Sequence, residues 1–169
     1  MKVIVCVDDK NGMLFNNRRQ SSDRMLRERM LALVGRSRLW MNAYSAKQFL
    51  ETTAMVVDET FLDKAQAGEY CFVENVDVLP FADTIEEVIL YRWNTVYPSD
   101  VRFPMELIEG KTPVSTADFA GHSHPKITEE IVTSVVEFAV KFFSVAVTPS
   151  DAFSVSLPSP IVGILMKLS

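Results

Sequence analysis

The sequence predicts an α/β protein with a mainly parallel sheet, flanking helices and an antiparallel C-terminal edge. The chain opens with an unbroken apolar run at Val3–Val7, which is typical of a central strand covered on both faces. Short strand patterns then alternate with short helical patterns, which favours parallel strands joined by helical crossovers. Two further strand patterns end this region, with no helical pattern between them.

Turn and capping residues follow the opening strand. Asp8–Asp9 ends the apolar run, and Lys10–Gly12 has the composition of a turn because Asn and Gly tolerate positive φ angles. Asn16–Arg19 is polar, and we expect a loop there. Ser21–Asp23 offers side-chain oxygens that can cap a helix. A loop that joins a strand end to a helix is where open α/β sheets bind ligands.

The later elements are predicted in order from periodicity and capping residues. Leu26, Met30, Leu33 and Val34 share one helical face, which predicts a helix over 23–34 that ends at Gly35. The remaining predicted elements are a strand at 38–41, a helix at 43–50 capped by Asn42, a strand at 54–58, a helix at 59–66, a strand at 70–73, an irregular segment at 78–83, a strand at 86–93 and a closing strand pair at 112–116 and 126–132.

Length and composition restrict the class of protein. The 169 residues suffice for one domain, or for one domain with an appendage. The net charge of −5 argues against general nucleic-acid binding. Cys6 and Cys71 lie in apolar strand patterns, where we expect buried free thiols. The N-terminus enters a strand without the pattern of a signal peptide, so we expect a cytoplasmic protein.

One segment of this acidic chain is basic. Between Arg18 and Arg38 there are seven arginines and two acidic residues, which gives a local charge of +5. A solvated helix face with its adjoining loop is the simplest interpretation. The alternative is a site for an anion such as phosphate or the RNA backbone.

The opening of the chain resembles that of the dihydrofolate reductases. In that family a first strand leads through a mobile loop into a helix whose start carries the catalytic carboxylate, and Asp23 stands nearest to this carboxylate here. The loop is about three residues shorter than in the family, and Arg19-Gln20 replaces the usual Pro-Trp. Leu39–Ser45, Ile89–Pro104 and His124–Val132 resemble later family segments in order, so the likeness covers residues 1–134.

The same resemblance implies that the family's cofactor site is dismantled. The paired glycines that let backbone amides approach a pyrophosphate are absent, and Glu74-Asn75 occupies their place. Ala43 stands where the family has an arginine for the cofactor's extra phosphate. Glu51–Thr53 occupies the region of the arginine that holds the folate tail. We therefore expect no cofactor and no ordinary NADPH-dependent folate reduction.

We expect instead a protein that binds a small planar or anionic ligand. The predicted cleft lies between the Asn11–Gln20 loop, the first helix and the Ile89–Trp93 strand. The candidate ligand-binding residues are Asn17, Arg18, Arg19, Trp40, Ser45 and Tyr91. The alternative is an altered reductase that uses NADP, with Asp23 as its catalytic residue.

A second alternative is a ribonuclease or an RNA-binding protein that uses the basic segment Arg18–Arg38. The opening is similar to that of small bacterial proteins that carry the label ribonuclease Z, and His122-Ser123-His124 begins like the zinc motif of such nucleases. That motif continues with Asp and His, whereas Pro125-Lys126 follows here, so we predict no metal site. A nucleophilic triad is not indicated either, because no serine has a strand–elbow–helix context.

The last part of the chain differs in composition from the rest. Residues 135–169 contain only four charged side chains and have no counterpart in the reductase pattern. The longest uncharged run is too short and too rich in proline for an ordinary transmembrane helix, so no membrane partner is expected. We predict an apolar C-terminal extension of unknown role, for which self-association is one option.

Overall fold

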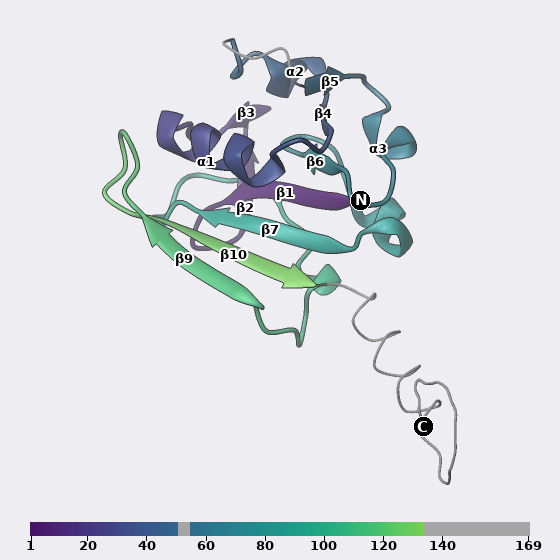
Figure 1. Ribbon diagram of the computed structural model, residues 1–169. Helices are drawn as coiled ribbons and strands as arrows, with labels where there is room; N and C mark the ends of the chain where they lie inside the picture. The colour runs from purple at the N-terminus through teal and green to yellow at the C-terminus, as the bar shows by residue number, and fades with distance from the viewer. Residues whose placement is uncertain (51–54, 134–169) are drawn as a thin grey trace, which may run out of the picture. The chain divides into compact units, whose positions relative to one another are not determined.

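The computed structural model describes residues 1–50 and 55–133 (Figure 1). Seven strands form the main sheet in the order β5-β4-β6-β1-β7-β10-β9. The five strands from β5 to β7 pair in parallel, and β10 and β9 add an antiparallel edge. The predicted α/β class, with its mainly parallel sheet and antiparallel edge, is confirmed. The predicted extension at 135–169 lies outside the described residues.

The opening strand β1 (Lys2–Val7) is central, as its composition predicts. It pairs in parallel with β6 (Tyr70–Phe72) on one side and with β7 (Glu87–Arg92) on the other. Val3, Val5 and Val7 belong to the apolar core on one face, and Ile4 belongs to the core on the opposite face. Alternate side chains of a strand point to opposite faces, so burial on both faces requires an unbroken apolar run.

Helix α1 (Arg24–Val34) covers the face of the sheet that is turned toward the viewer in Figure 1. Leu26, Met30 and Val34 are its buried residues, and they pack in the same core as Ile4 and Ile89. Asp23 caps the helix, and the backbone N–H of Gly35 donates to the Leu31 carbonyl at its end. The predicted helix and both of its boundary residues are confirmed.

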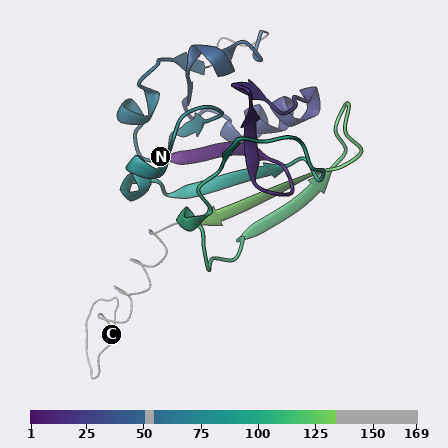
Figure 2. The same cartoon turned by 180° about the vertical axis from the view of Figure 1, so that it is seen from behind.

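The opposite face of the sheet carries a small antiparallel sheet, seen in Figure 2, where a polar loop was predicted. Its strands are β2 (Gly12–Phe15), β3 (Arg18–Arg19) and β8 (Val101–Arg102). Asn16 and Asn17 have φ angles of 51° and 59° and form the two-residue turn between β2 and β3. Two successive positive φ angles match the twist of paired strands, so the loop prediction was wrong because Asn-Asn acts as a hairpin turn.

The remaining elements agree with the predicted order but are shorter or shifted. Helix α2 (Ala43–Ala46) is capped by Asn42 as predicted, but it ends four residues early. The segment predicted as irregular holds a 3-10 helix, η1 (Leu79–Thr84). Strand β9 (Ser115–Phe119) starts three residues late and pairs with β10 (Ile127–Thr133) as predicted. The other elements are β4 (Leu39–Met41), β5 (Met55–Val57), α3 (Phe61–Lys64) and the 3-10 helix η2 (Met105–Leu107).

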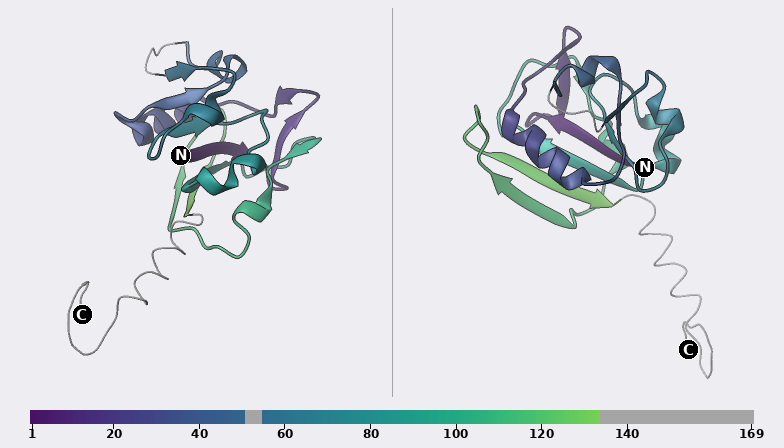
Figure 3. Two further views of the ribbon diagram at one scale, coloured as in Figure 1. Left: turned by 90° about the vertical axis from the view of Figure 1, so that its right-hand side faces the viewer. Right: turned by 45° about the horizontal axis from the view of Figure 1, so that its top comes forward.

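Figure 3 shows the sheet along two further directions, with α1 lying in front of its strands in the right-hand view. The start of α1 and the loop between β9 and β10 come from distant parts of the sequence but contact each other through hydrogen bonds. Within the described residues, no helix has the length and apolar character needed to cross a membrane.

Candidate functional site

A groove of about 750 Å³ lies where β2, β8 and the segment after β6 meet. One wall is apolar and includes Met13, Leu14 and Phe103. Polar residues from four parts of the chain complete the lining, and a groove with apolar walls and a few polar groups suits a small molecule. These polar residues are Asn17, Tyr44, Glu74, Asn75, Asp77 and Arg102.

Glu74, in the wall of this groove, forms an ion pair with Arg19. The guanidinium of Arg19 donates to Glu74 through Nε at 3.1 Å and through Nη2 at 2.9 Å. Glu74 is only 8% exposed and also accepts from Ser45 Oγ at 3.2 Å and from the side chain of Gln48. Arg19 lies over the Tyr44 ring, 4.5 Å from its centre. The carboxylate of Glu74 is thus neutralised and hydrogen-bonded within the protein.

One of the six predicted ligand-binding residues lines this groove, and two more contact a residue of its wall. Asn17 lines it, while Arg19 and Ser45 both donate to Glu74 in its wall. Arg18 is adjacent in β3, and its side chain is exposed. The sequence placed Glu74 and Asn75 in this region only as obstacles to a cofactor, whereas the structure makes Glu74 the centre of a polar network.

The other two predicted ligand-binding residues lie elsewhere. Trp40 is 7% exposed, and its indole N–H donates to Glu69 at 2.8 Å. Tyr91 is fully buried on the α1 side of the sheet and donates to Glu129 at 2.8 Å. Burial, followed by the negative charge of Glu129, raises the pKa of Tyr91 well above its usual value. Neither side chain lines the groove.

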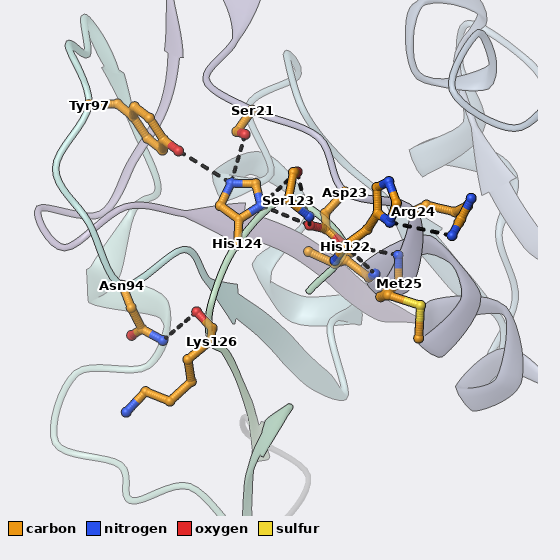
Figure 4. A network of polar contacts seen from close by, with 11 residues as sticks. Ser21, Asp23, Arg24, Met25, Asn94, Tyr97, His122, Ser123, His124 and Lys126 are labelled. Carbon is orange, nitrogen blue, oxygen red and sulfur yellow. Dashed lines mark hydrogen bonds and ion pairs between the residues drawn. The ribbon is translucent and has the colours of Figure 1, made fainter. Parts of the chain in front are cut away.

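Asp23 is held by donors from two distant segments, as Figure 4 shows. At the start of α1, its Oδ1 accepts from the backbone N–H of Met25 at 2.9 Å. The β9–β10 loop contributes the backbone N–H groups of His122 and Ser123, each at 2.9 Å. Burial alone would raise the pKa of Asp23, but these hydrogen bonds and the one from His124 lower the pKa well below its usual value. Asp23 is therefore a carboxylate at neutral pH.

His124 joins this carboxylate to two hydroxyl groups, as Figure 4 also shows. Its Nδ1 lies 2.8 Å from Oδ2 of Asp23, and its Nε2 lies 2.9 Å from Oγ of Ser21 and 3.3 Å from the Tyr97 hydroxyl. The Trp93 ring stacks on the imidazole with 4.6 Å between ring centres. Sequence reasoning missed this hydrogen-bonded chain because Ser21 and His124 are 103 positions apart.

The close approach of the β9–β10 loop to Asp23 depends on a glycine. A Cβ atom on Gly121 would lie 2.7 Å from Oδ2 of Asp23 and 2.9 Å from the His124 carbonyl oxygen. Both distances are shorter than van der Waals contact permits, so no other residue fits without a shift of the loop. Gly121, placed immediately before His-x-His, was the one sequence signal that could have pointed to this contact.

The described part of the chain offers no support for a metal centre or for a continuous basic surface. Within residues 1–50 and 55–133, no three His, Cys, Asp or Glu side chains are grouped to hold a metal ion. Four arginines of the basic segment are also paired with glutamates. These pairs are Arg19–Glu74, Arg24–Glu28, Arg29–Glu129 and Arg38–Glu69. Ion pairs with carboxylates reduce the positive charge available to a phosphate backbone.

The architecture is that of a dihydrofolate reductase-like fold, with a groove beside the carboxyl end of β6. Among solved structures, the chain is similar to the dihydrofolate reductase from Enterococcus faecalis complexed with NADP(H) and RAB-propyl. The TM-score is 0.55 at 7% sequence identity, and the match covers 79% of this chain and 95% of that chain. No family model and no curated protein matches the sequence. The predicted dihydrofolate reductase-like fold is thus confirmed at the level of structure.

Proposed function

We propose that the protein binds a small planar or anionic ligand in the groove lined by Asn17, Glu74 and Arg102, and that it does not perform ordinary NADPH-dependent folate reduction. The observation that carries the proposal is an open groove of about 750 Å³ whose wall contains two side chains, the carboxylate of Glu74 and the amide of Asn75. The volume falls in the range of small-molecule sites.

The chemistry of the wall supports a ligand other than a dinucleotide. A pyrophosphate needs backbone N–H groups that approach it closely, which side chains at Glu74 and Asn75 obstruct. Asp77 adds a second carboxylate to the lining. Arg102 is the cationic group in the same lining, and Phe103 supplies an aromatic surface. One cation beside a flat apolar wall suits a planar molecule with a single negative group.

A second candidate is an altered reductase that uses NADP and Asp23. Its support is that the similar solved structure was determined with NADP(H), which leaves NADP among the ligands to test. A reductase that relies on Asp23 needs this carboxylate to be free to support protonation of the bound substrate. Asp23 accepts six hydrogen bonds from protein groups, so the binding proposal fits the arrangement better.

Thermal shift measurements on the full chain test the proposal. Pterins, nucleoside monophosphates, NADP and NADPH are compared at equal concentrations, since a ligand that binds only the folded state raises Tm. We expect a planar anionic compound to raise Tm more than NADPH does. Replacing Val101, which is 43% exposed and lines the groove, by Trp narrows the groove and should abolish the shift.

Val96→Trp is the matched control, because Val96 is 54% exposed and does not line the groove. A shift that survives in Val101→Trp, or that is lost equally in Val96→Trp, would place the ligand elsewhere. Oxidation of NADPH in the presence of dihydrofolate is measured in parallel. Turnover that disappears in Asp23→Asn would favour the altered reductase over the binding protein.

A further inference from the structure

Asp23, His124 and Ser21 are hydrogen-bonded in the order of a catalytic triad, which we call the relay. The inference drawn from the relay does not require a ligand in the groove. Asp23 caps α1, Ser21 precedes it in the loop after β3, and His124 comes from the β9–β10 loop (Figure 4). One imidazole nitrogen faces the carboxylate at 2.8 Å, and the other faces the serine hydroxyl at 2.9 Å. This arrangement of nucleophile, base and orienting group is independent of fold.

The carboxylate determines which imidazole nitrogen carries the proton. Asp23 is ionised and can only accept, so Nδ1 of His124 donates to it. In the neutral ring, Nε2 then carries the lone pair that faces Ser21 Oγ. Stacking on Trp93 fixes the plane of the imidazole ring. The close packing of Gly121 against Asp23 fixes the loop that carries His124. His124 is thereby held as a base for the Ser21 hydroxyl.

Exposure to solvent increases from Asp23 through His124 to Ser21, and a reaction at Ser21 requires its hydroxyl to be accessible. The side chain of Asp23 is fully buried, and that of His124 is 9% exposed. Ser21 is partly exposed and borders a pocket of about 10 Å³ together with Gln20 and Trp93.

We propose that Ser21 is a nucleophile toward small activated esters, with His124 as its general base and Asp23 as the residue that positions His124. Ser21 Oγ forms a bond to the acyl carbon while its proton moves to Nε2 of His124. The bond from the acyl carbon to the leaving alcohol breaks, and Nε2 returns the proton to that alcohol. Water then attacks the acyl-serine with the same base, which releases a carboxylic acid and restores Ser21. The pocket of about 10 Å³ beside Ser21 has room for about one water molecule, so it does not accommodate a long acyl chain.

Covalent labelling of the full chain with a fluorophosphonate tests this activity. Peptide mapping by mass spectrometry should place the adduct on Ser21, and Ser21→Ala should remove it. Ser22→Ala is the matched control, because Ser22 is the exposed neighbouring serine and should leave labelling unchanged. His124→Gln and Asp23→Asn should each slow labelling by more than ~100-fold, since both break the relay.

Hydrolysis of para-nitrophenyl acetate gives a second measurement. We expect it to be faster than hydrolysis of para-nitrophenyl octanoate and to require Ser21. Should Asp23→Asn fail to fold, His124→Gln decides the outcome, provided that its urea unfolding resembles that of the wild type. No adduct on Ser21, equal labelling of Ser22, or labelling that is unaffected by His124→Gln would each overturn the proposal. None of these results depends on whether a ligand binds the groove lined by Val101.

Discussion

Nδ1 of His124 lies 2.8 Å from Oδ2 of Asp23, although the two residues are 101 positions apart in the sequence. The contact joins the start of the first helix to the loop between the last two described strands. Asp23 serves both segments at once, since it caps α1 and accepts two backbone N–H groups of the loop. The same carboxylate therefore ties the helix on one face of the sheet to the antiparallel edge.

Asp23→Asn should lower the free energy of unfolding by about 2–4 kcal/mol at neutral pH, because buried hydrogen bonds to a charged acceptor are lost. The folded pKa of Asp23 lies below its unfolded value, so this stabilisation is complete above the unfolded pKa of about 4. It declines as pH falls from there toward the folded pKa. Urea unfolding of both proteins from pH 7 to pH 3 measures the difference, and a difference that grows on acidification would contradict the assignment.

Gly121→Ala should destabilise the protein by about 1–3 kcal/mol, because the new Cβ would overlap Asp23 and the His124 carbonyl. Gly110→Ala is the control for backbone cost alone. Gly110 has a φ of +77°, but a Cβ atom there would meet no other atom within 4 Å, so about 1 kcal/mol is expected. Urea unfolding measures both. Equal costs, or loss of stability without loss of Ser21 labelling, would show that Gly121 does not position His124.

Arg19→Met should destabilise the protein by about 2–4 kcal/mol, because it leaves Glu74 buried and without its cation. Glu74→Gln alone should cost less, because Arg19 keeps 26% of its side-chain surface in water. The double variant should be more stable than the sum of the single effects predicts. Urea unfolding of the four proteins gives the coupling energy, and additive costs would argue that the pair contributes no net interaction.

Cys6 and Cys71 should react slowly with a thiol reagent in the native state. Burial raises the pKa of Cys71 to about 12 and raises that of Cys6 even further, so both thiols remain protonated at neutral pH. Cys71 is fully buried, so we expect its native rate to be roughly 100-fold below its rate in urea, because its reaction requires opening of the structure. Cys6 is only partly buried, so we expect a smaller difference for it. The variants Cys6→Ser and Cys71→Ser assign the two rates. A native rate equal to that in urea would contradict this burial.

Much of the fold follows from local sequence patterns. The β-branched run Val3–Val7 predicts a central strand because only a strand buried on both faces tolerates it, and the spacing of Leu26, Met30 and Val34 predicts α1. The hairpin at Asn16–Asn17 was missed although its signal is local. The ends of α2 and β9 were misplaced because tertiary packing, more than propensity, decides where short elements stop.

Patterns along the chain were enough to establish the α/β class, the central position of β1 and the capping role of Asp23. Folding in three dimensions was needed to show that Arg19 neutralises Glu74 and that His124 links Asp23 to Ser21. Hydrophobic periodicity and helix capping act over a few neighbouring residues, so both are visible in the amino-acid order. Hydrogen bonds between side chains 55 to 103 positions apart depend instead on how the sheet brings its loops together.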